Sequence, residues 1–161
     1  MKKEFKFTYD YFNSVDELSP VQQKAIKLAK EALKQAYAPY SNFRVGAALV
    51  LEDETYVLGS NQENKAYPSG LCAERVALFS YGAMKNTSEI KVLGIVGGDF
   101  MKDEKETFSP CGSCRQVMAE YADNQKEPFE IVLLNNDGSC VVFESIHHLL
   151  PFIFGSPQQS L

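Results

Sequence analysis

Cys72-Ala73-Glu74 and Pro110-Cys111-Gly112-Ser113-Cys114 are the two stretches around which this 161-residue chain is organised. Together they hold three of the four cysteines and one carboxylate. Three thiolates can bind a zinc ion in a tetrahedral site and leave its fourth position open for water. The two stretches therefore predict a metal centre with Cys72, Cys111 and Cys114 as ligands and Glu74 as the group that moves protons beside it.

A single Cys-x-x-Cys pair has three interpretations: half of a metal site, a redox pair, or coincidence. A redox pair needs neither a third cysteine nor a carboxylate nearby. A structural zinc site needs a fourth protein ligand, and the chain offers Cys140, His147 and His148. Cys140 lies in an apolar stretch typical of a buried strand, and adjacent helical residues such as the two histidines point in different directions. Three ligands with an open position favour a catalytic centre.

Glu74 says little by itself, because an acidic residue in the first turn of a helix is common and complements the helix dipole. Its offset of two residues from Cys72 keeps it away from the ligand face. That offset fits a carboxylate that reaches the metal-bound water without ligating the metal.

The bulk composition is ordinary for a globular protein, with 45% hydrophobic and 23% charged residues, and the length fits one domain. The net charge is −5 and no basic patch stands out, which disfavours a polymeric nucleic-acid partner. The chain shows neither a membrane-length apolar run nor a secretory signal. Four cysteines in such a chain are more often ligands, catalytic groups or buried thiols than disulfides. We expect a cytoplasmic protein with a small-molecule partner and no membrane partner.

The periodicity predicts alternating helices and strands. Helices are expected at 20–38, 71–84, 110–122 and 145–150, and strands at 43–51, 55–60, 90–98, 129–134 and 140–143. Ser19 and Gln22 form a capping box around Pro20 at the start of the first helix. This order predicts a layered α/β domain in which the first and last strand pairs can be antiparallel.

An N-terminal arm at 1–18 is predicted to precede a single domain at 19–161. Aromatic residues alternate with polar ones in this arm: Phe5, Phe7, Tyr9 and Tyr11. A period of two indicates extended chain. Such an arm can pack on its own domain or on a neighbouring subunit, and the sequence does not choose between them.

The metal motifs together resemble those of the zinc-dependent cytidine deaminases, in their small homotetrameric branch with three cysteine ligands. The likeness extends over most of the chain, from 40–48 through 61–64 and 67–68 to 149–151 and 154–155. The resemblance implies a three-layer α/β/α fold with a central mixed five-stranded sheet. It also implies hydrolytic deamination of cytidine and 2′-deoxycytidine to uridine and 2′-deoxyuridine plus ammonia, in pyrimidine salvage.

For the metal centre, the resemblance implies one zinc ion per chain on the three cysteines of the two motifs. Glu74 would take a proton from the zinc-bound water and pass protons to N3 of the cytosine ring and to the departing amino group. Arg75 and Arg115 are suited to donate hydrogen bonds to the thiolates and to offset their charge.

For the substrate, Asn61 and Glu63 match the pair that holds the ribose 3′-hydroxyl in the family. Phe43 matches an aromatic residue beside the pyrimidine. Ala73, together with Cys111, matches positions whose backbone groups contact the base. These residues imply a nucleoside and not another aminopyrimidine compound.

Two further residues match positions that reach a neighbouring subunit's site, Tyr67 towards the sugar and Phe154 from the C-terminal end. They imply a homotetramer whose active sites are shared between subunits. Lys65 departs from the family, which usually has Ala there, near the neighbour's 5′-hydroxyl.

The main alternative is a deaminase of the same fold that acts on another aminopyrimidine compound, as the blasticidin S deaminases do. A polynucleotide deaminase is disfavoured by the missing basic groove. A third alternative is a non-catalytic zinc-binding module in which the metal only supports folding.

Overall fold

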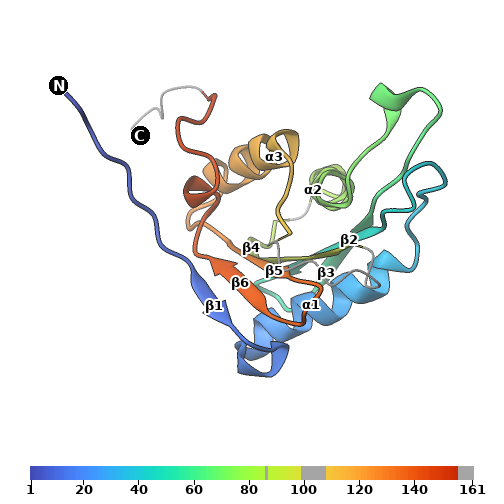
Figure 1. Ribbon diagram of the computed structural model, residues 1–161, viewed down its shortest axis with the longest axis horizontal. Helices are drawn as coiled ribbons and strands as arrows, with labels where there is room; N and C mark the ends of the chain where they lie inside the picture. Colours follow the sequence, from blue (N-terminus) through green and yellow to red (C-terminus); the bar gives the residue numbers. More distant parts are fainter. Residues whose placement is uncertain (86, 99–107, 156–161) are drawn as a thin grey trace.

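The computed structural model describes residues 1–85, 87–98 and 108–155. A mixed sheet with strand order β1-β6-β5-β4-β2-β3 forms its centre (Figure 1). Its strands are β1 (Asp10–Phe12), β2 (Val45–Leu51), β3 (Tyr56–Ser60), β4 (Ile90–Gly97), β5 (Glu130–Leu134) and β6 (Cys140–Phe143). The helices are α1 (Pro20–Leu33), α2 (Ala73–Ala83) and α3 (Gly112–Asp123), with short 3-10 turns η1 (Val15–Glu17), η2 (Tyr67–Ser69) and η3 (Ile146–His148).

The helices cover both faces of the sheet. Helix α1 packs on β2 and β4 on one face, while α2 and α3 lie together on the other (Figure 1). Each face has its own buried cluster: Ile26 and Val92 belong to the α1 side, and Leu78, Leu93 and Met118 to the α2–α3 side. The predicted three-layer α/β/α architecture is confirmed.

The strand pairing follows from the connections. Strands β2 and β3 are antiparallel, as are β5 and β6, so both predicted antiparallel pairs are observed. Strand β2 also pairs antiparallel with β4, and β4 pairs parallel with β5. A parallel pair needs a long crossover, and helix α3 lies in it.

The predicted strand count was wrong, because the sheet has six strands and not five within residues 1–85, 87–98 and 108–155. The sixth is β1, from the predicted N-terminal arm, which pairs antiparallel with β6 from Asp10↔Val142 to Phe12↔Cys140. Without it β6 would be an edge strand with open backbone groups. The period of two in the arm indicated extended chain but not its partner.

The element bounds differ from prediction mainly at the ends of helices. The capping box is confirmed, with the Ser19 N–H donating to Gln22 Oε1 at 2.9 Å. The helix predicted to reach residue 38 ends at Leu33, because the Tyr37 N–H donates to the Asn61 carbonyl at 2.9 Å in a β-bridge. The helix predicted at 145–150 is only the 3-10 turn η3.

The predicted strands shrink by a few residues at most, and the last one matches β6. Of the polar connection expected between β4 and α3, residues 99–107 lie outside the described part. Among the described residues no helix combines the length and the apolar character needed to cross a membrane.

Candidate metal centre

The three predicted ligands lie at the N-termini of two helices. Cys72 is the N-cap of α2, Cys111 is the N-cap of α3, and Cys114 lies in the first turn of α3. Cys111 therefore precedes the helix instead of lying inside the predicted 110–122 helix, with Pro110 one residue earlier. Two helix N-termini converge on the thiols, and their free N–H groups and dipoles favour thiolates.

The sulfur atoms form one cluster. All three lie within 4.8 Å of one another, with 3.4 Å between Cys111 and Cys114 and 4.0 Å between Cys72 and Cys111. A tetrahedral zinc ion with Zn–S bonds of about 2.3 Å requires sulfur atoms roughly 3.8 Å apart. Cys111 is exposed while Cys114 is buried, so the cluster opens to solvent on one side. The donor set and spacing fit zinc.

The thiols of Cys72 and Cys114 have pKa values shifted in opposite directions. The hydrogen bond from the Cys114 thiol lowers the pKa of Cys72 to about 5, and Arg75 contributes by donating from Nη2 to the Cys72 sulfur at 3.8 Å. The same hydrogen bond, together with burial, raises the pKa of Cys114. The shared hydrogen bond thus favours the thiolate form of Cys72 and the protonated form of Cys114.

The other candidate ligands lie elsewhere. Cys140 is fully buried in β6 and belongs to the cluster on the α1 side of the sheet, and burial raises the pKa of its thiol to about 11. His147 lies 3.5 Å from Asp123 at the end of α3. His148 follows it in η3. All four cysteines are described, and none is in a disulfide.

Glu74 is a buried carboxyl beside the thiols. It lies in the first turn of α2, and only 3% of it is exposed. Burial raises the pKa of Glu74 to about 6, and the charge on Cys72 adds to the effect. A carboxyl with such a pKa can both accept and release a proton near neutral pH.

Gly59 in β3 sets the position of α2. A Cβ atom at this residue would lie 2.3 Å from the Ala73 carbonyl oxygen and 2.5 Å from the Ala77 nitrogen. The first turn of α2 therefore packs directly on the backbone of β3. Because this turn carries Glu74 and follows Cys72, the close contact fixes both groups against the sheet.

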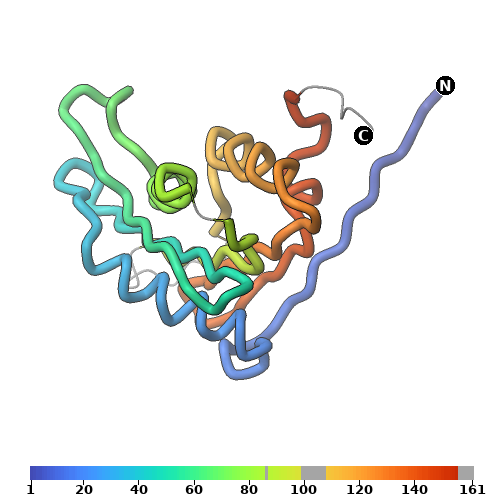
Figure 2. Tube along the Cα trace, turned by 180° about the vertical axis from the view of Figure 1, so that it is seen from behind, coloured from blue at the N-terminus to red at the C-terminus, as the bar shows by residue number. Residues whose placement is uncertain are grey.

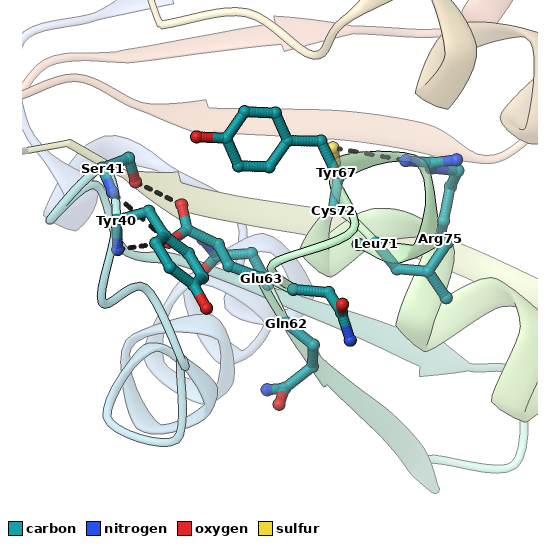
Figure 3. Close-up of a pocket in the computed structure, with 11 residues that line it drawn as sticks. Tyr40, Ser41, Gln62, Glu63, Tyr67, Leu71, Cys72 and Arg75 are labelled. Carbon is teal, nitrogen blue, oxygen red and sulfur yellow. Dashed lines mark hydrogen bonds between the residues drawn. The ribbon is translucent and has the colours of Figure 1, made fainter.

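A cavity of about 470 Å³ opens beside Cys72. Its lining residues come from the segment after α1, from the 61–64 segment and from the start of α2: Tyr40, Ser41, Asn61, Gln62, Glu63, Asn64, Tyr67, Gly70, Leu71, Cys72 and Arg75. Figure 3 shows the Glu63 carboxylate turned towards Tyr40 and Ser41, and Arg75 turned towards the Cys72 sulfur. The cavity size is typical of small-molecule sites.

Asn61 and Glu63 hold the segment that precedes β2. Asn61 is buried, donates from Nδ2 to the Phe43 carbonyl and accepts from the Val45 N–H, both at 2.8 Å. Glu63 accepts hydrogen bonds from the Tyr40 N–H at 2.9 Å, the Ser41 N–H at 3.3 Å and the Ser41 hydroxyl. The hydroxyl and the Tyr40 N–H lower the pKa of Glu63. Both side chains thus line the cavity and hold the segment before β2 in place.

Phe43 has an aromatic neighbour that sequence reasoning missed. Its ring lies 6.0 Å from that of Phe108, which packs over Gly97 at the end of β4. The buried Asn135 holds this segment, because its Oδ1 accepts from the Phe108 N–H at 3.1 Å. Phe108 ends a polar connection without periodicity, so only its position before Ser109-Pro110 could have singled it out.

Arg115 is placed differently from Arg75. Its guanidinium donates to the Pro110 carbonyl at 2.8 Å, to the Leu149 carbonyl at 2.7 Å and to the Ser109 hydroxyl at 2.7 Å. These bonds tie the ligand loop to the C-terminal segment. The predicted donation from Arg115 to the thiolates stays a prediction.

The remaining residues singled out from the sequence are Ala73, Tyr67, Phe154 and Lys65. Ala73 is fully buried in the first turn of α2, and Tyr67 lines the cavity with 78% of its surface exposed. Phe154 lies outside the Cys72 cavity, 88% exposed, while its carbonyl accepts from the side chain of Gln116 at 2.6 Å. Lys65 is exposed on the 61–70 segment.

Three clustered thiols on two helix N-termini, with a buried carboxyl beside them, define a candidate thiolate metal centre. The comparisons with known proteins give this class a family. Residues 19–126 match the family model described as "Cytidine and deoxycytidylate deaminase zinc-binding region". The chain belongs to the cytidine and deoxycytidylate deaminase family, and zinc is the metal of its matched region.

Individual relatives agree over most of the chain. A cytidine deaminase from Sporosarcina psychrophila is 39% identical over 138 residues, which is 86% of this chain and 94% of the relative. A cytidine deaminase from Halalkalibacterium halodurans is 42% identical over 133 residues, 83% of this chain and 93% of the relative. The crystal structure of cytidine deaminase from Burkholderia pseudomallei has a TM-score of 0.71 and 43% identity, covering 82% of this chain and 98% of that one.

Proposed function

We propose that this chain is a zinc-dependent hydrolase that deaminates cytidine and 2′-deoxycytidine to uridine and 2′-deoxyuridine, with release of ammonia. The relatives named cytidine deaminase support the reaction. The observation that carries the proposal is the buried Glu74 carboxyl beside the thiols of Cys72, Cys111 and Cys114. Uridine, the product of cytidine deamination, fits a role in pyrimidine salvage.

The residues divide the chemistry between them. The three thiolates hold zinc, which when bound supplies hydroxide near neutral pH by lowering the pKa of water. Glu74 would take a proton from the attacking water and deliver it to N3 of the cytosine ring, and would then carry the proton of the hydroxyl group added at C4 to the departing amino nitrogen. Arg75 donates to the Cys72 sulfur and offsets part of the negative charge of three thiolates. Arg115 is proposed to add to this offset from α3.

The substrate contacts are proposed from the cavity lining. An ionised carboxylate has about four acceptor sites, and Glu63 uses three on Tyr40 and Ser41, which leaves one for the ribose 3′-hydroxyl. Asn61 uses one of its two N–H donors and one acceptor site on backbone, so it too can bind this hydroxyl.

The pyrimidine ring is proposed to lie against Phe43, whose ring is 6.0 Å from that of Phe108. The backbone groups of Ala73 and Cys111, at the start of α2 and α3, are proposed to contact the base. These contacts favour a nucleoside over the blasticidin-type compounds, because such compounds lack the ribose that Asn61 and Glu63 would hold.

The test is turnover by the Glu74→Gln variant. The zinc-loaded wild-type protein should remove the absorbance of cytidine, and a chelator-treated sample should not. Because Gln cannot move protons but keeps the shape of Glu, the variant should retain its zinc content and lose at least about 10²–10⁴-fold in kcat. Full turnover by Glu74→Gln would contradict the mechanism, and zinc retention without any wild-type turnover would favour a non-catalytic zinc module.

The assembly proposed is a homotetramer with shared active sites. Phe154 supports it, because its backbone is held by Gln116 while its ring is 88% exposed. Tyr67 lines the cavity and is also largely exposed, at 78%. Both rings are proposed to reach a neighbour's site.

The proposed domain organisation is an arm at 1–18 and one catalytic domain at 19–161, a division supported by the family match, which begins at residue 19. A cytoplasmic location is supported by the free thiols, since free cysteines persist in reducing compartments.

A further inference from the structure

The N-terminal arm extends beyond the sheet that it joins. Strand β1 pairs with β6 only over Asp10–Phe12, in antiparallel register, and β6 ends at Phe143. In this register Tyr9 lies opposite Phe143, and residues 1–8 continue past the end of their partner strand. Figures 1 and 2, seen from opposite sides, both show this segment leaving the edge of the sheet as an extended chain directed away from the helices.

One side of the arm carries a row of four aromatic side chains, here called the aromatic row: Phe5, Phe7, Tyr9 and Tyr11. Tyr11 is opposite Val141, and the Tyr9 ring lies 5.7 Å from that of Phe143. Both β6 residues face the α2–α3 side of the sheet. Side chains two apart in extended chain point the same way, and the contact between the Phe5 and Phe7 rings, 6.4 Å apart, agrees with this. The row thus continues one face of the sheet past its edge.

The aromatic row leaves an apolar surface in contact with water. Each of its four side chains is between 49% and 55% exposed. An aromatic side chain can bury about 150–250 Å², so the row leaves roughly 400 Å² to be covered. Contiguous apolar patches of a few hundred Å² mark interaction sites. The free edge of β1, the outermost strand, also offers unpaired backbone groups.

Charge indicates what covers the row. Residues 1–9 hold three lysines and one glutamate, a net charge of +2. The whole chain carries −5, so the remaining residues carry −7. A second copy of the same chain therefore presents an acidic surface to a basic arm, and complementary charge steers such an association. In a two-fold arrangement each subunit gives one arm and receives one.

We propose that residues 1–9 dock on a second copy of this chain, with the aromatic row as the contact surface and the net positive charge of the arm steering it to the acidic copy. The inference rests on the homo-oligomer of the proposed function and adds a contact away from the active site. Because the family match begins at residue 19, this contact belongs to the extension of this chain and not to the shared deaminase domain.

The test compares two double variants of the full-length zinc-loaded protein by sedimentation over a range of concentrations. Phe5→Ser with Phe7→Ser removes half of the aromatic row, while Lys6→Arg with Thr8→Ala changes the other side of the same segment and keeps its net charge. The first should raise the dissociation constant of the oligomer by about tenfold or more, and the second by much less. Added salt should weaken the wild-type assembly, because it screens the lysines. Equal dissociation constants for wild type and Phe5→Ser/Phe7→Ser would overturn the proposal.

Hydrogen exchange of the arm separates a contact with a second copy from one within the chain. The amides of residues 4–9 should be protected at concentrations where the protein is assembled and should exchange freely after dilution to the monomer. Protection that does not change on dilution, or no protection at either concentration, would also overturn the proposal. Sedimentation and exchange use no substrate, so they stand apart from the deaminase test, and both double variants should keep wild-type kcat at concentrations where they assemble.

Discussion

At the scale of single residues, Glu74 sits in surroundings that oppose its charge. Its carboxyl is 3% exposed, and burial raises its pKa from 4.5 to about 6. In the metal-free protein the folded state therefore binds a proton that the unfolded state has lost between these two pH values. Stability from this residue is complete below pH 4.5 and falls as the pH rises through 6.

Replacing Glu74 by Gln should remove this pH dependence. We expect the free energy of unfolding of metal-free Glu74→Gln, relative to metal-free wild type, to increase by about 2 kcal/mol between pH 4 and pH 7, since a pKa difference of one unit corresponds to about 1.4 kcal/mol. Urea unfolding of both proteins at the two pH values measures it. A difference between the two proteins that stays constant with pH would mean that Glu74 ionises in the folded state as easily as in the unfolded state.

Gly59 is a second residue with a sharp prediction. Its missing side chain lets α2 rest on β3, and a Cβ would meet the Ala73 carbonyl at 2.3 Å. Gly59→Ala should lower the free energy of unfolding by about 1–3 kcal/mol, as overpacking does, and should weaken zinc retention because Cys72 shifts with the helix. Gly112→Ala is the control: a Cβ there meets nothing within 4 Å. Equal stability of the two variants would contradict the close-packing argument.

The thiol ligands could be predicted from sequence because their spacing and residue type are themselves the chemical signal. The surroundings of Phe43 could not. Phe108 and Asn135 are far apart in sequence, and only the end of the parallel pair β4–β5 brings them together. Asn61 was predicted as a ribose ligand. Its hydrogen bonds to the backbone of Phe43 and Val45 could not be predicted from sequence, because they also join residues that are far apart in the chain.

At the scale of elements, Arg115 connects α3, the ligand loop and the C-terminal segment. It makes three hydrogen bonds, to Pro110, Leu149 and Ser109, from a planar fork of donors. Pro110 directly precedes the ligand Cys111, so the fork should hold that ligand in place.

Arg115→Lys keeps the charge but cannot reproduce three fixed donors. We expect the variant to lose zinc to a competing chelator about tenfold more readily, in line with the 10–100-fold effects of residues that support metal ligands. Gln116→Ala is the matched control, since it releases only the Phe154 carbonyl. Should both variants retain zinc like wild type, Arg115 would serve only the C-terminal segment.

The elements themselves were largely predictable, because the core strands are near-continuous apolar runs and the capping box marks the start of α1. The ends of the helices were harder to predict. The chain after Leu33 has helical composition, yet Tyr37 is held by Asn61 and Glu63 across a β-bridge. Strand β1 was missed for a similar reason: a three-residue strand depends on the open edge of β6 and not on its own pattern.

At the scale of the whole molecule, the described chain keeps Phe154 away from its own cavity. Phe154 is 88% exposed and does not line that cavity, and its carbonyl accepts a hydrogen bond from the Gln116 side chain in α3. If the ring completes the site of a neighbour, each active site combines Glu74 from one chain with Phe154 from another. Phe154→Ala and Glu74→Gln then damage different halves of the same site.

Mixing the two variants should therefore restore turnover. Alone, each variant should deaminate cytidine slowly, Glu74→Gln for want of a proton carrier and Phe154→Ala for want of a contact to the substrate. In an equal mixture, dissociated and reassembled, about a quarter of the sites combine an intact Glu74 with an intact Phe154, given random exchange between equivalent subunits. Turnover should rise towards a quarter of the wild-type value per site. A mixture no more active than the mean of its two components would show that each chain closes its own site, and Phe154 would then have no part in a neighbour's.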